Sequence, residues 1–456
     1  MKSEQKHMIF FKDYYNQFIE DLEGLLRIPS VLSEFTPQNS EAPFGRDIRK
    51  ALNYMLAIGE RDGFKTVNVD NYCGYIEYGE GSELLVILCH LDVVPATGNW
   101  TNPPFDPIIK EGKIYARGAI DDKGPLMASY YALKMLKDND YCPNKRIRFI
   151  FGCDEESGSR GLHHYLSKYP TAEYGFSPDA NFPVIYAEKG ICSIKFSGKT
   201  SDDNLISFDS GTVSNVVPDK ATAEIAIDLK NEFLRFAEQN DMRGLVNKNK
   251  YTLFGSAAHG SLPETGKNAA LYLAYFLSNY ISNPFIDFIN QYLFFDFTGE
   301  KLGIATYDEE MGHVSNNAAI FKLNNNRFEI TCNIRYPRNF DFDQNMLKLK
   351  EFANAKDMNL LLLYNSKPHY VPKGSLIVRS LMKAYKRWTF GTGLDAFEPI
   401  SIGGGTYARD FENAVAFGPV FPKEEEHMHM PDEYADLSNL ILASFIYQDA
   451  IKNICG

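Results

Sequence analysis

The sequence predicts an α/β fold: a mixed, mainly parallel sheet with flanking helices, into which a smaller α+β domain is inserted. Two observations support this fold class. In the first third of the chain, short aliphatic runs alternate with amphipathic helical patterns, an order typical of a parallel sheet covered by helices. From about residue 189 the pattern changes to alternating strands, and after Val371 helices and Gly-rich turns return. We therefore expect a larger first domain over 1–188, which 369–456 completes, and an inserted domain over 189–368.

The first expected elements are two helices and a buried strand. Apolar residues at helical spacing predict one helix that stops before Pro29 and a second that ends at Gly59 or Gly63. The aliphatic run Leu84–Cys89 predicts a parallel strand, because such strands are covered on both faces and contain few polar residues.

The next elements continue this order and then change in the inserted domain. A helix with proline at its first position is expected from Pro125, followed by a strand at Ile147–Phe151. In the inserted domain, alternation predicts strands at Ala221–Ile227 and Phe328–Arg335, with a helix around Asn268–Tyr280. The change from parallel to alternating patterns marks the second domain.

The composition indicates a well-packed globular protein of about two domains. Its 456 residues are 44% hydrophobic and carry a formal net charge of −12, which disfavours nucleic acid and anionic membranes as partners. The seven cysteines form no Cys-x-x-Cys pair, so we expect free thiols in a reducing compartment. Met1–His7 does not resemble an export signal, and no apolar run reaches about 18 residues. We expect a cytoplasmic protein that does not span a membrane.

The tripeptide His90-Leu91-Asp92 follows the strand predicted at Leu84–Cys89. Open α/β sheets place their ligands at the carboxyl ends of parallel strands. Residues two apart in an extended chain point to the same side, so an imidazole and a carboxylate project together. This arrangement suits a metal-binding histidine and an acid that orients a ligand or a base. Taken alone, the pair also fits a structural His–Asp contact, because buried ion pairs need no function.

Four further segments place acids or histidines at a predicted strand end or turn. Asp121-Asp122 stands in a tight turn before a helix, where an N-cap would also explain an aspartate. Asp154-Glu155-Glu156 follows a buried strand; a solvated loop is one explanation, but adjacent carboxylates repel one another unless positive charge lies between them. Asp179 alone is typical of a turn. Two histidines stand near the other end of the chain, His427 and His429.

Together these positions form one set of nitrogen and oxygen donors. Such a set suits two divalent ions, zinc first and manganese or cobalt as alternatives, with one carboxylate shared between the metals. A carboxylate that is not a ligand is then needed as general base, and Glu155 is the candidate. The five expected ligands are His90, Asp121, Glu156, Asp179 and His429.

With these motifs in place, the chain resembles the co-catalytic dinuclear zinc metallopeptidase family of carnosinases, aminoacylases and bacterial glutamate carboxypeptidase. The resemblance runs nearly end to end, from Leu25-Leu26-Arg27-Ile28-Pro29-Ser30-Val31 through every segment above, with the five ligands in the family order. It implies a zinc-peptidase-like catalytic domain with an inserted lid domain. It also implies peptide-bond hydrolysis by a metal-bridging water that Glu155 activates.

The resemblance assigns roles around the first metal. His90 would bind this metal, and Asp92 would orient His90 from behind. Asp121 would bridge both ions, and the peptide bond that joins it to Asp122 would be cis.

The remaining ligands follow from the same resemblance. Glu156 and Asp179 would be terminal ligands, and His429 would complete the second metal. His427 is the competitor for that last role. His429 is preferred because His-Met-Pro-Asp-Glu matches the family's His-x-Pro-Asp/Asn-Glu pattern.

The inserted domain resembles the family's lid. His259 would reach over the metals and stabilise the oxyanion, although a surface turn would also explain a histidine between Gly and Pro residues. Asn215 and Arg335 would receive polar groups of the substrate, and an arginine fork suits a free C-terminal carboxylate. Backbone N–H groups of Gly404 and Gly405 could serve the same carboxylate.

We therefore expect a metal-dependent dipeptidase, acting on dipeptides with free amino and carboxyl ends. An N-acyl amino acid deacylase (aminoacylase) of the same family is the runner-up. A catalytically silent relative that binds metal or peptide is disfavoured, because the base and all five ligand positions are intact. The lid of about 180 residues resembles that of a family dipeptidase that acts as a monomer, so we expect a monomer. The acidic run Glu424–Glu426 has no role in this interpretation.

Overall fold

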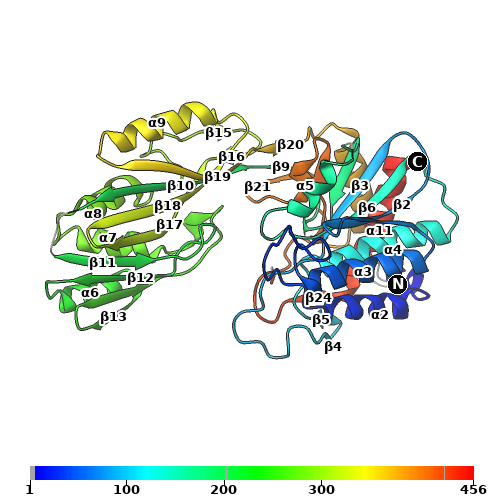
Figure 1. Cartoon of the computed structure of the whole chain (residues 1–456), viewed down its shortest axis with the longest axis horizontal. Coiled ribbons are helices and arrows are strands. Elements are labelled where there is room, and N and C mark those ends of the chain that lie inside the picture. Colours follow the sequence, from blue (N-terminus) through cyan, green and yellow to red (C-terminus); the bar gives the residue numbers. More distant parts are fainter. Residues whose placement is uncertain (1–5, 170, 201–203, 426) are drawn as a thin grey trace. The chain divides into compact units, whose positions relative to one another are not determined.

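The computed structural model describes residues 6–169, 171–200, 204–425 and 427–456. The chain forms two compact units (Figure 1). Unit 1 comprises Met1–Ala187, Val371–Ile400 and Gly405–Gly456, and unit 2 comprises Glu188–Tyr370 and Ser401–Gly404. Unit 2 is inserted in the sequence of unit 1. The predicted fold class, a mixed sheet with flanking helices and an inserted α+β domain, is confirmed.

One short segment lies in a different unit from the one expected. The sequence predicts Ser401–Gly404 in the first domain, but this segment belongs to unit 2. The Lys189 amide donates to the Ile402 carbonyl (3.0 Å), and the Arg335 guanidinium donates to the Gly403 carbonyl (3.0 Å). These bonds join residues far apart in the sequence, so no local pattern indicates them.

A mixed sheet forms the centre of unit 1. Its strands lie in the order β1-β2-β6-β3-β7-β22-β9, and β3 is parallel to both of its neighbours. All seven residues of β3 are buried, as expected for a central parallel strand. The bounds are β1 (Lys65–Val69), β2 (Cys73–Tyr78), β3 (Leu84–His90), β6 (Arg146–Gly152), β7 (Tyr174–Ser177), β9 (Ile185–Glu188) and β22 (Ala414–Ala416). Shorter strands are β4 (Ile108–Lys110), β5 (Lys113–Tyr115), β8 (Ala180–Asn181), β23 (Pro419–Val420) and β24 (Tyr434–Asp436).

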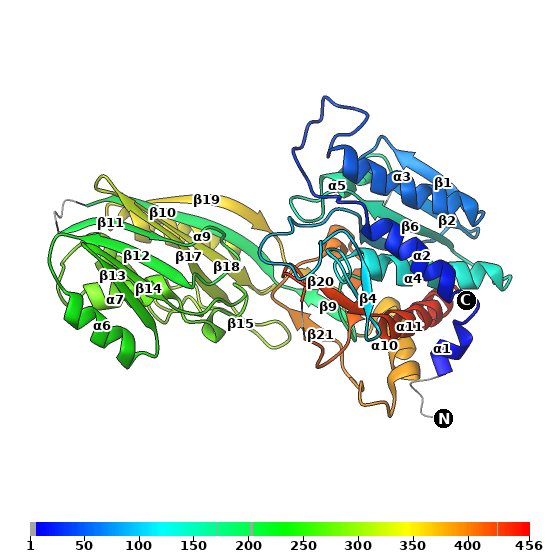
Figure 2. The ribbon, with the colours of Figure 1, turned by 90° about the horizontal axis from the view of Figure 1, so that it is seen from below.

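Helices pack against this sheet, with α3 on β1 and β2 and α4 on β3, and α10 lies beside α11 (Figure 2). The second predicted helix continues through Gly59, where a Cβ would lie 2.6 Å from Ile76, so glycine permits the close packing. Across the described residues, every helix is too short or too polar to cross a membrane. The bounds are α1 (Lys6–Phe10), α2 (Tyr15–Leu26), α3 (Arg46–Arg61), α4 (Lys123–Asp138), α5 (Arg160–Leu166), α10 (Leu376–Thr389), the 3-10 turn η4 (Tyr407–Asp410) and α11 (Leu437–Cys455).

One predicted helix start is wrong by two residues. The helix α4 begins at Lys123, so Pro125 is its third residue rather than its first. The first N–H groups of a helix have no acceptor inside it, and proline is therefore tolerated here.

Unit 2 is built on an eight-stranded antiparallel sheet. The strands lie in the order β13-β14-β12-β11-β17-β18-β10-β19. The bounds are β10 (Gly190–Lys199), β11 (Leu205–Ser210), β12 (Lys220–Ile225), β13 (Arg243–Asn247), β14 (Lys250–Phe254), β17 (Ser315–Asn324), β18 (Arg327–Tyr336) and β19 (Asn359–Ser366). Two-residue strands are β15 (Tyr307–Asp308), β16 (Gly312–His313) and β20 (His369–Tyr370). In β21 (Ile400–Ile402), the first residue belongs to unit 1 and the other two belong to unit 2.

The helices of unit 2 cover one face of this sheet. Cys192, Ile194 and Phe196 alternate along β10 and join one hydrophobic core with Phe233 of α6 and Leu349 of α9. The intervening residues of β10 therefore point to the other face, which these helices do not cover. The bounds are α6 (Lys230–Gln239), η2 (Pro263–Thr265), α7 (Ala269–Leu277), α8 (Pro284–Phe288), the π-turn η3 (Ile289–Leu293) and α9 (Phe342–Asn354).

The edge strand β19 leaves apolar side chains in solvent. Four consecutive residues, Leu361 to Tyr364, are between 43% and 54% exposed. The strand pairs only with β10 among the described strands and contains no charged residue.

Candidate metal centre

His90 is the last residue of β3 and is fully buried. Its Nδ1 lies 2.9 Å from the backbone carbonyl of Asp92, and because a carbonyl only accepts, Nδ1 carries a hydrogen and donates it. The other nitrogen, Nε2, lies 3.0 Å from Oδ1 of Asp121 and 3.4 Å from Oδ2 of Asp179. A nitrogen facing two carboxylates requires a proton or a metal ion between them.

The Asp92 carboxylate contacts the loop after β6. Its Oδ1 accepts hydrogen bonds from the amides of Asp154 (2.6 Å) and Glu155 (3.0 Å), and its Oδ2 accepts from the amide of Glu156 (3.2 Å). The carboxylate is 3.7 Å from Nδ1 of His90, which is beyond a hydrogen bond. The backbone of Asp92 therefore orients His90, and its side chain fixes the loop that carries Glu155.

Asp121 lies between two histidines. Its Oδ1 is 3.0 Å from Nε2 of His90, and its Oδ2 is 2.8 Å from Nε2 of His429. The peptide bond from Asp121 to Asp122 is cis, as expected. Asp122 precedes α4 without capping it by a side-chain hydrogen bond, and its Oδ2 instead accepts from the His90 amide (2.9 Å). The aspartate pair thus contacts His90 at the end of β3 and does not cap α4.

His429, and not His427, approaches this cluster. Nε2 of His429 lies 3.3 Å from Oε2 of Glu156, whereas Nε2 of His427 lies 3.4 Å from Oε2 of Glu425. The His429 side chain is 51% exposed, against 15% or less for the other four expected ligands. This histidine therefore marks the open side of the cluster.

The acidic run beside His427 has a structural explanation in part. Glu424 accepts hydrogen bonds from the Phe421 amide (2.6 Å) and from the Asn439 side chain. It therefore ties its loop to the start of α11. Glu426 lies outside the described residues.

The cluster holds more carboxylates than cations. Contact with Asp121 and then Glu156 raises the pKa of His429 to about 11. Burial and the charge of Asp121 raise the pKa of Glu156 to about 7. Burial also raises the pKa of Glu155 well above its usual value, and the charges of Asp179 and Glu156 add to this shift while His90 opposes it. Without a further cation, protons must settle on these groups.

The donor set fits divalent metal ions. His90, Asp121 and Glu156 each offer one ligand atom within 4.8 Å of the others. Oε1 of Glu156 is buried and has no hydrogen-bond partner among the described residues, as expected for an oxygen that serves a cation. Imidazole nitrogen and carboxylate oxygen form the donor mixture that zinc, manganese and cobalt accept.

Two buried residues that the sequence analysis did not single out hold the Asp121 turn. The Glu433 carboxylate accepts hydrogen bonds from the amides of Ile120 (3.0 Å) and Asp121 (3.3 Å) and pairs with Arg117 (2.5 Å). Both side chains of this pair are at most 1% exposed. Glu433 ends the motif that begins at His429, which is a usable signal. Arg117 lies 316 residues before Glu433 in the sequence, and no local pattern indicates its role.

Asn215 and His259 are neighbours within unit 2. The Gly260 amide donates to the Asn215 carbonyl (2.7 Å), and Val216 forms an isolated bridge with His259. Nδ1 of His259 lies 2.7 Å from Oγ of Ser261, and the side chains of Asn215 and His259 are both exposed. The two loops that carry them are thus joined.

Arg335 lies on the face of the unit 2 sheet that the helices leave uncovered. Its Nε donates to Oδ1 of Asn333 (2.7 Å), and its Nη1 donates to the Gly403 carbonyl (3.0 Å). Asn333 donates in turn to Oγ of Ser193 (3.0 Å). These bonds hold the guanidinium in one orientation.

The two glycines expected to offer N–H groups fall in different units. Gly404 ends the unit 2 segment, and Gly405 begins the next unit 1 segment. A Cβ at Gly405 would lie 2.6 Å from Cζ of Arg409, at the end of a flexible side chain that can shift. The structure brings together seven expected site residues in unit 1: His90, Asp92, Asp121, Glu155, Glu156, Asp179 and His429. The unit 2 set is Asn215, His259, Arg335 and Gly404.

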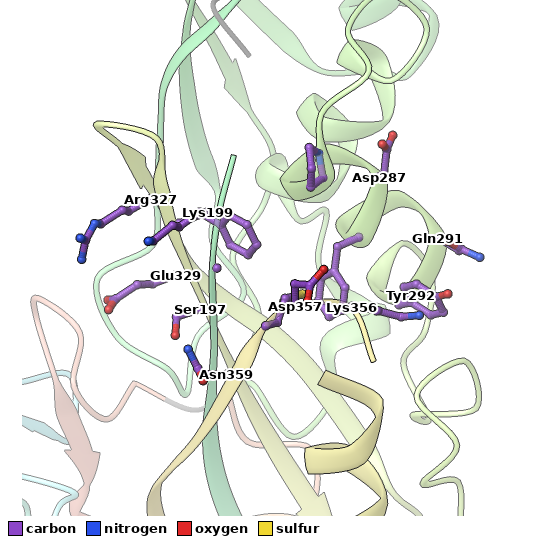
Figure 3. A pocket seen from close by; sticks show the side chains of 15 residues that line it. Ser197, Lys199, Asp287, Gln291, Tyr292, Arg327, Glu329, Lys356, Asp357 and Asn359 are labelled. Carbon is purple, nitrogen blue, oxygen red and sulfur yellow. The ribbon is translucent and has the colours of Figure 1, made fainter. Parts of the chain in front are cut away.

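A cavity within unit 2 is lined by none of these residues. It has a volume of about 760 Å³ and lies where β10 ends and β18 begins, beside α8. Figure 3 shows Lys199, Arg327 and Glu329 on one side of it and Asp287 and Tyr292 on the other. Acidic and basic side chains are balanced here, which gives no basis for a metal or anion site.

Comparisons with known proteins place these observations in a family context. A family model described as Peptidase family M20/M25/M40 matches residues 86–453. A protein of Staphylococcus haemolyticus named "Putative dipeptidase" is 40% identical over 467 residues, covering 97% of this chain and 98% of the relative. One of the same name from Staphylococcus aureus strain MW2 is 40% identical over 465 residues, with the same coverage.

Solved structures share the fold at low identity. Human carnosine dipeptidase 1 has a TM-score of 0.62 at 15% identity, covering all of this chain and 99% of that chain. The di-peptidase Dug1p of Saccharomyces cerevisiae has a TM-score of 0.60 at 13% identity, covering 99% and 98%. These likenesses extend over both units.

Proposed function

Because this chain belongs to peptidase family M20/M25/M40, we propose that it is a dinuclear metal-dependent dipeptidase that hydrolyses the peptide bond of dipeptides. Relatives named as dipeptidases, 40% identical over nearly the whole chain, support this substrate class. The observation that carries the proposal is the position of Asp121. Its two carboxylate oxygens approach two different histidines, His90 and His429. A carboxylate so placed is suited to bridge two metal ions about 3.5–4 Å apart.

The five donors would hold two divalent ions, zinc first and manganese or cobalt as alternatives. Bound ions of this kind polarise a scissile carbonyl and lower the pKa of water toward about 7. Glu155 lies in this cluster but is not one of the five proposed ligands. It accepts the proton of the attacking water and returns it to the leaving amine. Asp92 supports this role because its carboxylate holds the Glu155 amide.

The substrate contacts come from the resemblance to the family. His259 stabilises the oxyanion, and Asn215 and Arg335, with the N–H groups of Gly404 and Gly405, receive the polar ends of the dipeptide. The Asn333 and Gly403 bonds that orient the Arg335 guanidinium support this assignment, because a fixed fork suits a carboxylate.

The test is hydrolysis by the metal-reconstituted protein, with the metal content of the same sample measured. We expect two ions per chain and cleavage of dipeptides with free ends. Chelation should abolish this activity, and zinc, manganese or cobalt should restore it. Hydrolysis of N-acyl amino acids alone would make the protein an aminoacylase. Metal binding without hydrolysis of either substrate class would make it a catalytically silent relative.

We also propose that the protein acts as a cytoplasmic monomer. All seven cysteines are free thiols, which supports a reducing compartment. Light scattering should give a mass near 51.7 kDa. A mass near twice this value would contradict the proposal.

A further inference from the structure

Asp154, the residue before Glu155, has an unusual backbone conformation. Its φ is +95°, a region that residues with a Cβ rarely adopt. Such a conformation persists only when surrounding contacts impose it, and it occurs often at functional sites. Asp154 is also completely buried. The contacts of its carboxylate therefore decide how the next residue is presented.

The Asp154 carboxylate is bound by Arg160 and Ser157. Nε of Arg160 donates to Oδ2 (2.6 Å), and Nη2 donates to Oδ1 (2.6 Å), so the guanidinium binds bidentately. The Arg160 amide also donates to Oδ2 (3.1 Å), and Oγ of Ser157 donates to Oδ1 (2.5 Å). The Asp154 carbonyl accepts from the Ser159 amide (2.6 Å). The loop 154–160 is thus closed by its own side chains.

Arg160 is anchored outside this loop as well. Its guanidinium carbon lies 4.3 Å from the ring centre of Phe35, which stacks on Phe44 at 5.2 Å. Phe44 is 1% exposed. The arginine therefore connects the loop to an aromatic pair that precedes α3, of which Phe44 is the buried member.

Asp92 holds the same loop from the opposite side. Its carboxylate accepts hydrogen bonds from three successive amides, those of Asp154, Glu155 and Glu156. These amides converge on one carboxylate only while residue 154 keeps its left-handed conformation. A change of φ at this residue would turn the Glu155 side chain away.

We propose that Asp154 and Arg160 form a positioning pair that holds Glu155 in its orientation for proton transfer. This proposal rests on the proposed role of Glu155 as general base. Neither residue needs to touch substrate or metal.

The experiment compares two replacements of Arg160. Arg160→Met removes the fork, whereas Arg160→Lys keeps the charge and can restore one hydrogen bond. We expect kcat on a dipeptide to fall about 10- to 100-fold in Arg160→Met, because small misplacements of a catalytic group have costs of this size. KM should stay within about threefold, and Arg160→Lys should recover part of the lost kcat. All assays use saturating metal, with bound metal measured.

A matched control is present in the same unit. Arg61 binds the buried Asp21 bidentately (2.7 and 2.8 Å), and its side chain is 38% exposed against 34% for Arg160. Arg61→Met therefore removes a similar ion pair and should leave kcat within about twofold. If Arg160→Met fails to fold, the double variant Asp154→Asn/Arg160→Met avoids a buried unpaired charge, and asparagine tolerates positive φ.

A second readout does not depend on activity. Amide hydrogen exchange of the peptide covering residues 150–160, measured without added metal, should be at least about tenfold faster in Arg160→Met than in Arg61→Met. Equal kcat and equal exchange in these two variants, with the unsubstituted protein active, would overturn the positioning role. An unsubstituted protein that binds metal but cleaves no dipeptide would overturn the proposed function, and if it also hydrolyses no N-acyl amino acid, the role of the pair in proton transfer falls with it.

Discussion

The two units hold their functional side chains in opposite electrostatic states. In unit 1, burial and neighbouring acids raise the pKa values of Glu155, Glu156 and Asp179, so this cluster needs cations. In unit 2, the corresponding residues are the cation Arg335 and uncharged amides such as Asn333, which suit the polar ends of a peptide. In the proposed function, this difference places the metals and the base in unit 1, and the residues that bind the ends of the peptide in unit 2.

The units also differ in how the backbone supports these groups. In unit 1 the site residues lie at strand ends and in loops, which distant side chains must hold in place. In unit 2, Ser193, Asn333 and Asn317 form a row across three paired strands, fixed by the strand register itself. We therefore expect substitutions at the unit 1 site to lower kcat, and substitutions of the unit 2 residues that bind the ends of the peptide to raise KM.

The largest expected effect is that of Glu155→Gln in unit 1. Glutamine is similar in shape but cannot accept the proton, so kcat should fall about 10³-fold. Bound metal, measured on the same sample, should not change.

Glu173→Gln is the control for this change. Glu173 accepts from the Leu84 amide (2.7 Å) at the start of β3, a bond that a glutamine oxygen can still form. This variant should stay near full activity. If Glu155→Gln retained its activity, Glu155 would not be the general base, and the contrast between the two units would fail.

Arg335→Met in unit 2 should have the next largest effect. Loss of a charge-assisted bidentate contact corresponds to an increase in KM of about 10- to 100-fold, with kcat changed much less. Lys195→Met, on the same face of the sheet and paired with Glu329 at 2.8 Å, should leave both constants nearly unchanged. A fall in kcat alone for Arg335→Met would contradict a recognition role.

Asn317→Ala should have the smallest effect. The Asn317 side chain donates to the carbonyls of Ser214 (3.0 Å) and Val216 (3.1 Å), which flank Asn215. Loss of these bonds should loosen that loop and raise KM about 3- to 10-fold. Asn316→Ala removes a bond to the Asp296 carbonyl (3.1 Å) in another region and should not raise KM. Equal KM values in the two variants would contradict a role for the Asn215 loop in recognition.

The sequence predicts much of unit 1, because buried strands and strand-end acids leave local patterns. The run Leu84–Cys89 indicates β3, and the choice of His429 over His427 agrees with the distances to Asp121 and Glu156. The fold class follows from the same alternation of strands and helices. Such features depend on neighbours in the chain.

The supports of the site could not be predicted in the same way. Whether the Asp92 side chain meets His90 or the loop amides depends on the path of β6, and the Arg117–Glu433 pair joins residues 316 apart. The φ of +95° at Asp154 follows from tertiary contacts, since nothing in the residue type requires it. Sequence patterns indicate which groups are present, and tertiary structure determines which of them hold the others.

The uncharged edge strand β19 has a consequence for the colloidal behaviour of the protein. Edge strands offer unpaired backbone groups to similar strands, and charged residues or prolines usually block this pairing. None of the eight residues of β19 is charged or proline. The formal net charge of −12 therefore provides the repulsion between copies, and this repulsion is screened at about 1 M salt, where the Debye length is about 3 Å. Solubility should fall as ionic strength rises, while the fold itself remains intact.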